Sequence, residues 1–341
     1  MEVRFEFRRY RAPFRVPVRT AHGWWPAREG VIVRLEQASG VIGWGEAAPI
    51  PWFGTESVDE VVQACAALGA TTSTDLLARL PTRLGCLRAA VASALATPPV
   101  PRHPHLAVAA LLPAGRGALE VLPTRAELGF RTFKWKVGVG PVADELALLD
   151  DVCAALPAGA RLRLDANGAW DGRQAQRWLE RCAERPVEFV EQPCLAPPTA
   201  TATERSRIDD LLLGLAADFP TPLALDESVV GDQDVVRWLG AGWPGWFVVK
   251  PALVADLTGT LAALSLARAR VVFSSALETA IGARAALRAA FAWEGTAAAL
   301  GFGVFPLFEN PSFDAVPAPV PFLRVEDVVA GNEEALWNAL S

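Results

Sequence analysis

The stretch R-T-F-K-W-K-V-G-V-G, residues 131–140, places two lysines within a run of large apolar side chains. Phe133 and Trp135 favour a β-strand, because aromatic side chains fit a pleated and half-buried surface. Side chains two positions apart on a strand point to the same face. Lys134 and Lys136 are therefore expected on one face, with Phe133 and Trp135 on the other. A largely apolar strand thus directs two positive charges into one space. Such charges need either neighbouring acidic side chains or a catalytic function to explain them.

Short apolar runs alternate with longer helical patterns over most of the chain after residue 104. The expected strands lie at 105–113, 131–138, 161–167, 187–193, 222–228, 246–251, 270–278 and 299–308. Strands that alternate with helices predict a parallel sheet, and about eight such units predict a (β/α) barrel. A doubly wound sheet is the alternative, although no G-x-G-x-x-G turn follows the first strand.

The first hundred residues follow a different pattern. Residues 1–50 are rich in strand formers with a hairpin signal at 38–40, and helical spacing follows at 57–69 and 87–96. Three prolines in 98–104 indicate a linker. We therefore expect an N-terminal domain over 1–100, a barrel over 101–310, and a segment over 311–341 that returns to the N-terminal domain.

Composition excludes several classes of protein. The 341 residues are 52% hydrophobic and carry a net charge of −6, with no basic patch for nucleic acid. No apolar run reaches the ~18 residues of a membrane span, and the charged N-terminus is unlike a signal peptide. Five scattered cysteines predict free thiols in a reducing compartment. These features predict a soluble, cytoplasmic protein.

Five of the expected strands end in a charged residue: Lys136, Asp165, Glu191, Asp226 and Lys250. In a parallel barrel the carboxyl ends of the strands form the active-site face. Asp165 or Asp226 taken alone is more simply read as a helix cap. The five together do not fit that interpretation, because caps do not require lysines and Glu191 is followed by Gln-Pro.

Asp165, Glu191 and Asp226 would repel one another in a pocket of low dielectric constant, and a divalent cation would resolve this. A set of carboxylate oxygens without His or Cys favours Mg²⁺, with Mn²⁺ possible, over Zn²⁺. These three acids are the predicted metal ligands. A neighbouring dication would also lower the pKa of a lysine and make it usable as a base.

The two lysines that flank the acids predict proton transfer next to a carboxylate. A substrate carboxylate on the metal would place its α-proton between Lys136 and Lys250, and a lysine would remove it while the metal stabilises the enediolate. Lys134 points the same way as Lys136. It is equally well interpreted as a residue that modulates the charge of Lys136 or as a lysine paired with a neighbouring acid.

The motifs resemble those of the enolase superfamily, in its muconate-lactonizing-enzyme-like subgroup. They are K-W-K at 134–136, L-D-A-N at 164–167, E-Q-P at 191–193, L-D-E-S at 225–228, V-K-P at 249–251, G-W-G-E-A-A-P at 43–49 and S-S-A-L-E-T-A-I-G at 274–282. The resemblance implies an α/β protein with a modified (β/α)7β TIM-type barrel and an α+β capping domain.

Within the subgroup, R-L-D-A-N, S-S-A-L-E and L-G-F-G-V-F are most similar to the o-succinylbenzoate synthase family. That likeness implies a lyase that dehydrates 2-succinyl-6-hydroxy-2,4-cyclohexadiene-1-carboxylate to 2-succinylbenzoate in menaquinone or phylloquinone biosynthesis. The alternatives are an N-acylamino acid racemase, a dipeptide epimerase or a cycloisomerase. An epimerase is disfavoured because residues 301–310 lack the D-x-D pair usual in that group. The expected partner is a small carboxylate, and a homo-oligomer is left open.

The resemblance also implies roles for single residues. Lys136 would abstract the α-proton and then assist loss of the β-hydroxyl, while Lys250 would stabilise the intermediate by charge or cation–π contact. Residues expected to orient the ligands or contact substrate are Lys134, Arg163, Asn167, Glu227, Ser274 and Ser275. Caps, surface pairs and turns are competing interpretations of Asn167, Glu227 and the two serines.

Glycines and aromatic residues at 20–30 and 51–57 predict lid segments over the pocket, with His22 as a candidate substrate contact. Two readings outside this chemistry stay open. A Schiff-base aldolase would use Lys136 or Lys250 as nucleophile. A barrel kept only as a binding protein would be expected to have lost some of the acids and lysines.

Overall fold

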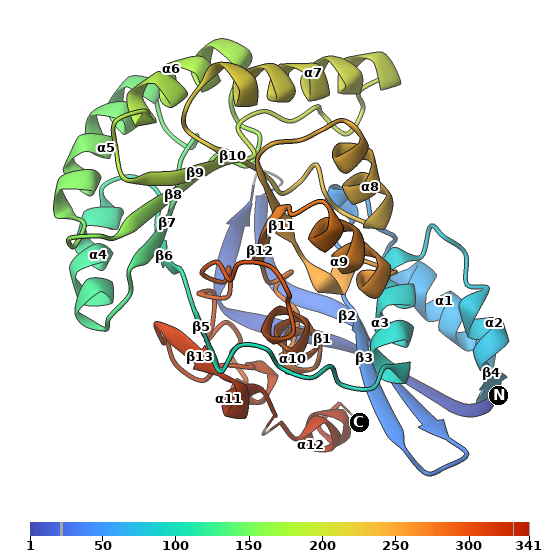
Figure 1. Ribbon diagram of the computed structural model, residues 1–341. Coiled ribbons are helices and arrows are strands. Elements are labelled where there is room, and N and C mark those ends of the chain that lie inside the picture. The colour runs from blue at the N-terminus through green and yellow to red at the C-terminus, as the bar shows by residue number, and fades with distance from the viewer. Residues whose placement is uncertain (21–22, 330, 341) are drawn as a thin grey trace.

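The computed structural model describes residues 1–20, 23–329 and 331–340. Figure 1 shows an antiparallel sheet with small helices beside a curved parallel sheet that is covered on its outer face by larger helices. The fold class expected from the sequence is confirmed: an antiparallel capping sheet accompanies a TIM-like barrel domain. Each helix in the described residues is too short or too polar to cross a bilayer.

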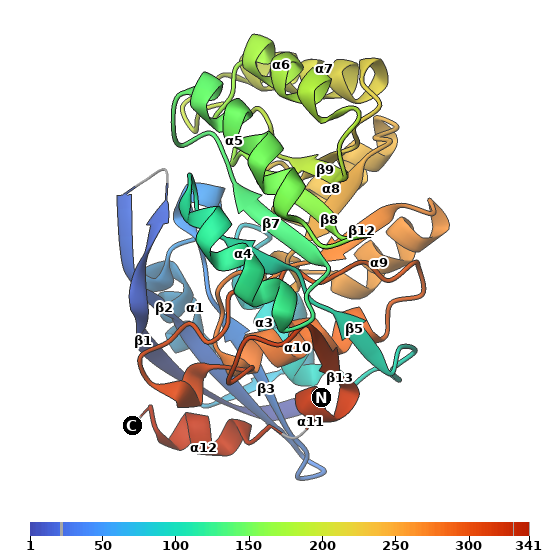
Figure 2. The same ribbon diagram turned by 90° about the vertical axis from the view of Figure 1, so that its left-hand side faces the viewer.

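The capping sheet has the strand order β3-β2-β1-β4. Its strands are β1 (Glu2–Thr20), β2 (Gly23–Gln37), β3 (Ile42–Ala47) and β4 (Thr71–Ser73). The hairpin predicted at 38–40 is confirmed, since β2 and β3 pair antiparallel around it. Figure 2 shows β1 and β2 as a long ribbon along one side of the molecule. β1 continues through the two prolines at positions 13 and 17.

Helices cover one face of the capping sheet. They are η1 (Pro51–Phe53), α1 (Val58–Leu68), α2 (Thr74–Ala78) and α3 (Gly85–Leu95). A Cβ atom at Gly43 or Gly45 of β3 would collide with a backbone carbonyl oxygen of α3, that of Ala94 or Ala90. The glycines of the G-W-G-E motif therefore let α3 lie directly on the strand.

The parallel sheet has the order β12-β11-β10-β9-β8-β7-β6. Its strands are β6 (Ala110–Leu112), β7 (Thr132–Lys136), β8 (Arg161–Asp165), β9 (Val187–Glu191), β10 (Leu223–Leu225), β11 (Trp246–Val249) and β12 (Arg270–Phe273). The connecting helices are α4 (Gly117–Glu127), α5 (Val142–Ala155), α6 (Gly172–Cys182), α7 (Ala202–Asp218), α8 (Asp232–Gly240), η2 (Pro251–Leu253), α9 (Leu257–Leu266) and α10 (Ala280–Phe291). Trp135 is fully buried and meets Trp178 of α6 edge-on, so it points outward under a helix as expected.

The prediction of a regular eighth strand at 299–308 was wrong. These residues, all of them described, form only the isolated bridges Val108↔Leu300, Ser274↔Gly301 and Phe14↔Phe308. The Leu300 amide donates to the Ala107 carbonyl (2.7 Å) and the Gly301 amide to the Phe273 carbonyl (2.8 Å), so two residues link both edges of the sheet. Glycines and a proline within 301–306 prevent a longer ladder.

The C-terminal segment contains η3 (Pro311–Phe313), β13 (Phe322–Arg324), α11 (Val325–Val329) and α12 (Glu333–Asn338). β13 pairs with β5 (His105–Ala107), on the barrel side. Trp337 of α12 packs on Trp44 of β3 and lies 4.2 Å below the guanidinium carbon of Arg8. The segment thus contacts both parts, and the division at 1–100, 101–310 and 311–341 stays a prediction.

Glu278, just before α10, makes the stability of the folded state depend on pH. Burial, with Glu46 nearby, raises the pKa of this carboxyl to about 7, although its own backbone, Ala276 and Arg28 oppose the shift. The folded state therefore holds a proton that the unfolded chain releases near pH 4.5, and stability falls as pH rises from about 4.5 to 7. At ~1.4 kcal/mol per pKa unit, the loss is about 3 kcal/mol at most.

We expect Glu278→Gln to leave the free energy of unfolding at pH 5 nearly unchanged and to raise it at pH 8 by up to about 3 kcal/mol relative to the parent. Denaturant unfolding at the two pH values measures this, with the exposed Glu180→Gln as control. An equal effect of Glu278→Gln at both pH values would contradict the expectation.

Candidate active site

The charged strand ends meet at one edge of the parallel sheet. Lys136, the last residue of β7, is in register with Asp165, the last residue of β8, and Asp165 is in register with Glu191, the last of β9. Asp226 and Lys250 directly follow β10 and β11. The in-register parallel pairing places all five at the carboxyl ends of neighbouring strands, as the sequence predicted.

Lys134 joins two of the predicted metal ligands. Its Nζ lies 2.9 Å from Asp165 Oδ2 and 2.7 Å from Glu191 Oε1. Burial works to lower the pKa of Lys134, but the two carboxylates outweigh it and the pKa is raised above its ordinary value. Of the two interpretations of Lys134, the structure has the one in which it pairs with neighbouring acids.

The same charges set the pKa values of the two carboxyls. For Asp165, burial raises the pKa, but Lys134, Lys136 and Lys250 together leave it below the ordinary value. For Glu191, burial and the charge of Asp165 prevail over Lys134, and the pKa is raised. Two acids at successive strand ends therefore differ in how readily they ionise.

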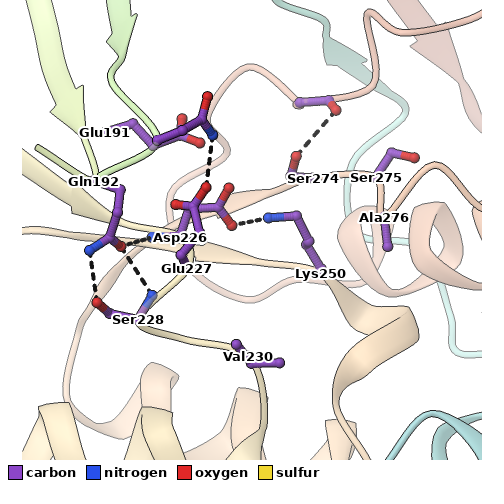
Figure 3. Close-up of polar contacts among 12 residues, drawn as sticks. Glu191, Gln192, Asp226, Glu227, Ser228, Val230, Lys250, Ser274, Ser275 and Ala276 are labelled. Atoms are coloured by element: carbon purple, nitrogen blue, oxygen red, sulfur yellow. Dashed lines mark hydrogen bonds and ion pairs between the residues drawn. The ribbon is translucent and has the colours of Figure 1, made fainter. Parts of the chain in front are cut away.

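Lys250 lies on the other side of the group and is paired with Asp226 (Figure 3). Its side chain is 9% exposed, and burial lowers its pKa to about 8 in spite of Glu191 and Asp165 nearby. Its Nζ is 5.1 Å from the centre of the Phe53 ring. Phe53 belongs to the predicted lid segment 51–57, so the capping part reaches the site there. His22 of the other lid segment lies outside the described residues.

Asn167 and Glu227 form a pair beside the acids. The Asn167 side-chain amide donates to Glu227 Oε1 (2.7 Å), and the Asn167 backbone amide donates to Asp165 Oδ1 (3.2 Å). Burial, followed by the charge of Asp165, raises the pKa of Glu227 to about 7. Asn167 contacts one predicted ligand through its backbone, and Glu227 contacts Asn167, so a role of the two residues in orienting the ligands stays a prediction.

Arg163 lies lower in the barrel. It is 1% exposed, donates to Glu188 Oε2 (2.6 Å) and to the Ala299 carbonyl (2.7 Å), and lies 4.8 Å from the Phe189 ring centre. Among the described residues it has no hydrogen bond or ion pair with the three acids. These contacts indicate that Arg163 ties β8 and β9 to the closing segment around 299, and a contact with substrate stays a prediction.

Ser274 and Ser275 follow β12 and are both buried (Figure 3). Ser274 Oγ donates to the Gly301 carbonyl (3.3 Å), and Ser275 Oγ accepts from the Leu277 amide (2.9 Å). The second contact is the turn function that competed with substrate binding in the sequence. Ser275 keeps its own hydroxyl proton for a ligand, so both interpretations of this residue stand.

Gln192 is a residue that the sequence reasoning missed. It is fully buried with φ of +37°, and its side-chain oxygen accepts from the amides of Asp226 and Ser228, each at 3.0 Å. Its side-chain nitrogen donates to Ser228 Oγ (2.8 Å) and to the Cys194 carbonyl (2.9 Å). Figure 3 shows this amide facing Ser228. The signal was its place directly after Glu191, where it can tie one ligand strand to the next.

We expect Gln192→Met, which keeps the volume and removes four hydrogen bonds, to raise the Mg²⁺ concentration for half-maximal activity by roughly 10- to 100-fold, because groups that orient metal ligands have effects of this size. Titration of activity with Mg²⁺ measures it, and Gln63→Met on the exposed face of α1 is the control. An unchanged Mg²⁺ dependence in a folded variant would show that Gln192 does not position Asp226.

The donor set fits a hard divalent cation. Among the described residues, no three His, Cys, Asp or Glu side chains stand close enough to enclose a metal ion. The three acids are instead paired with ammonium groups, Asp165 and Glu191 with Lys134 and Asp226 with Lys250. Two of these acids already converge on one positive charge, and all of the donors are oxygen atoms, as Mg²⁺ requires.

Comparisons with known proteins agree with this arrangement. The family model "Enolase C-terminal domain-like" matches residues 118–321, and "MenC, N-terminal domain" matches residues 3–82. The o-succinylbenzoate synthase of Thermosynechococcus vestitus is 40% identical over 311 residues, which cover 89% of this chain and 92% of that protein. The chain belongs to the o-succinylbenzoate synthase family. The function expected from the sequence, a dehydratase of the lyase class, is confirmed at this level.

Further relatives and structural neighbours agree with this family membership. The o-succinylbenzoate synthase of Thermobifida fusca is 31% identical, covering 92% of this chain and 87% of that one. A similar solved structure is the o-succinylbenzoate synthase of Thermosynechococcus elongatus, complexed with Mg in the active site. Its TM-score is 0.79 at 36% identity, and the match covers 98% of this chain and 99% of that one. The L-Ala-D/L-Glu epimerase of Bacillus subtilis shares the fold. Its TM-score is 0.80 at 21% identity, and the match covers 94% of this chain and 95% of that one.

Proposed function

We propose that this chain dehydrates 2-succinyl-6-hydroxy-2,4-cyclohexadiene-1-carboxylate to 2-succinylbenzoate with Lys136 as the acid–base residue. The observation that carries the proposal is the position of Lys136 and Lys250 on opposite sides of three strand-end acids. A carboxylate substrate held there has its α-carbon within reach of a lysine. Membership of the o-succinylbenzoate synthase family supports this substrate over others.

Lys136 would carry out both proton transfers. Its neutral amine takes the α-proton, and the electrons of the C–H bond move toward the carboxylate to give the enediolate. The resulting ammonium then donates a proton to the β-hydroxyl on the same face as the C–O bond breaks. Water leaves, and the ring becomes aromatic. A single group can do both because it ends the first step in the form that the second step needs.

Asp165, Glu191 and Asp226 would hold Mg²⁺, with Mn²⁺ as an alternative, in line with the Mg reported in the active site of the Thermosynechococcus elongatus structure. When bound, the ion supplies positive charge that offsets the negative charge gained by the carboxylate as the proton leaves. Asn167 would keep Asp165 oriented through its backbone amide. Lys250 would face the opposite side of the ring and stabilise it by charge or cation–π contact.

A racemase or epimerase is the second candidate. Two lysines on opposite faces are the arrangement that two-base proton exchange needs, which favours this alternative over a cycloisomerase. Residues 301–310 contain no D-x-D pair for a substrate ammonium group. A Schiff base on Lys250 is disfavoured, since that lysine is paired with Asp226. A Schiff base on Lys136 would not require Mg²⁺, so metal-dependent turnover would argue against it.

The cellular setting follows from the same proposal. The product would enter menaquinone or phylloquinone biosynthesis. All five cysteines are free, which supports a reducing, cytoplasmic location. A homo-oligomer is compatible with the family and is to be measured by light scattering.

The deciding experiment is an absorbance assay with the cyclohexadiene substrate, in Mg²⁺ and in excess EDTA, beside a panel of N-acylamino acids and dipeptides. We expect Mg²⁺-dependent formation of 2-succinylbenzoate that greatly exceeds any racemisation. A folded, Mg²⁺-binding protein with no turnover of the diene would overturn the proposal. Efficient racemisation without dehydration would establish the second candidate.

A further inference from the structure

Glu46 connects the capping sheet to the barrel through hydrogen bonds that are buried. It lies in β3 and is 3% exposed. Its Oε1 accepts from the Tyr10 hydroxyl (2.5 Å) and from the Thr279 amide (2.9 Å). Its Oε2 accepts from the Thr279 hydroxyl and from the Gly282 amide (2.9 Å). One carboxylate of the capping sheet thus receives the donors at the start of α10, where a negative charge is favoured.

The space around this carboxylate is filled. A Cβ atom at Gly282 would lie 3.0 Å from Glu46 Oε2 and 2.8 Å from Glu278 Cγ. A Cβ atom at Gly30 would lie 2.7 Å from the Tyr10 hydroxyl oxygen. The close packing leaves Glu46 and the first turn of α10 little room to move relative to each other.

The same helix start holds the segment that carries Ser274 and Ser275. The buried Ala276 belongs to the hydrophobic cluster that is formed mainly by residues of the capping part. Leu277 has φ of +60°, a conformation that costs a residue with a side chain about 1 kcal/mol or more. The segment therefore keeps its shape because it is fixed on both sides, by β12 before it and by Glu46 and α10 after it.

We propose that Glu46 is a positioning residue for the end of the substrate that lies away from the metal. This inference rests on the proposed function and on the expectation that Ser274 and Ser275 contact the substrate, with their donors facing its second carboxylate. Glu46 fixes Thr279, Thr279 begins α10, and the start of α10 fixes the two serines. The capping sheet thereby sets the affinity for the second carboxylate, without contacting either the metal ligands or the substrate.

The test compares two ligands that differ only at that end. The product 2-succinylbenzoate carries both carboxylates, and 2-butyrylbenzoate has a methyl group in place of the second one. We expect Glu46→Gln to weaken binding of 2-succinylbenzoate by roughly tenfold, the order expected when a hydrogen bond to a charged group loses its geometry. Binding of 2-butyrylbenzoate should change by less than twofold. Calorimetric titration of the Mg²⁺-loaded protein measures both.

Matched variants separate positioning from stability. Tyr10→Phe removes a hydrogen bond from the same carboxylate on the capping side alone, so we expect a lower melting temperature with unchanged selectivity between the two ligands. Thr279→Val removes the barrel-side hydroxyl and should reproduce the loss of selectivity, while Thr279→Ser should restore it. The Thr279 variants carry the test if Glu46→Gln does not fold.

Equal weakening of the two ligands, or no weakening of either, in Glu46→Gln and Thr279→Val would overturn the inference while the parent protein still turns over the diene. Failure of the parent itself to bind 2-succinylbenzoate would overturn the proposed function and this inference with it.

Discussion

Replacing Lys136 with alanine should lower kcat by about 10⁴-fold or more, because one residue performs both the proton abstraction and the protonation of the leaving group. The loss should occur without loss of folding. Among the described residues, the ammonium group of Lys136 has no hydrogen bond or ion pair, whereas those of Lys134 and Lys250 neutralise buried acids. Lys136→Ala therefore leaves no buried carboxylate unpaired.

The measurement is the rate of 2-succinylbenzoate formation under saturating Mg²⁺, with the melting temperature and Mg²⁺ affinity of the same sample. Lys136→Arg is the matched variant, since it keeps the positive charge but cannot act as a base near neutral pH. We expect it to be as inactive as Lys136→Ala. A Lys136→Arg enzyme with substantial activity would show that Lys136 serves by its charge, and another group would have to be the base.

The strand register explains how much of this site the sequence alone could predict. Side chains alternate strictly along a strand, so a lysine or an acid at the end of an apolar run has a fixed face and a fixed end. Lys136, Asp165 and Glu191 are placed by that rule, and the structure has them in register. Asp226 and Lys250 fall just beyond their strands, where the same rule still applies.

The residues that were missed depend on contacts between segments that are distant in sequence. Gln192 binds groups more than 30 positions away, and its place directly after Glu191 does not by itself reveal these partners. Lys134 was left between two interpretations because its partners are decided by distances across the sheet. Helix α4 was missed because Pro123 interrupts its pattern. A strand was wrongly predicted at 299–308 because the apolar residues there are buried in irregular structure.

The distribution of lysine and arginine also marks the site. The chain contains 32 lysines and arginines, of which only Lys134, Lys136 and Lys250 are lysines. Lys136 and Lys250 lie at the carboxyl ends of barrel strands, and Lys134 lies two residues before Lys136 on the same strand. An arginine cannot lose its proton near neutral pH, so a chain that otherwise uses arginine keeps lysine where a proton has to move or an ammonium group has to fit.

Replacing Glu191 with glutamine should abolish Mg²⁺ binding in the micromolar to millimolar range and lower kcat on the order of 10³-fold, the effect of losing a major electrostatic group in a site. The metal-free variant should fold at least as well as the parent at neutral pH. Burial and Asp165 raise the pKa of Glu191, so its charge is disfavoured in the folded state and a neutral isostere removes that cost. Lys134 still keeps Asp165 as a partner.

Melting temperatures of the parent and of Glu191→Gln, each measured with and without Mg²⁺, test this together with the activity assay. The parent should melt at a higher temperature with Mg²⁺ and lose activity reversibly in EDTA, because a cation that binds the folded state stabilises it. Glu191→Gln should melt at the same temperature in both, and the exposed Glu184→Gln should behave as the parent. A Glu191→Gln protein that Mg²⁺ still stabilises would remove Glu191 from the ligand set. The positive charge of Lys134 would then be the principal partner of that carboxylate, and the cation would have to be held by Asp165 and Asp226 with a further group such as Glu227.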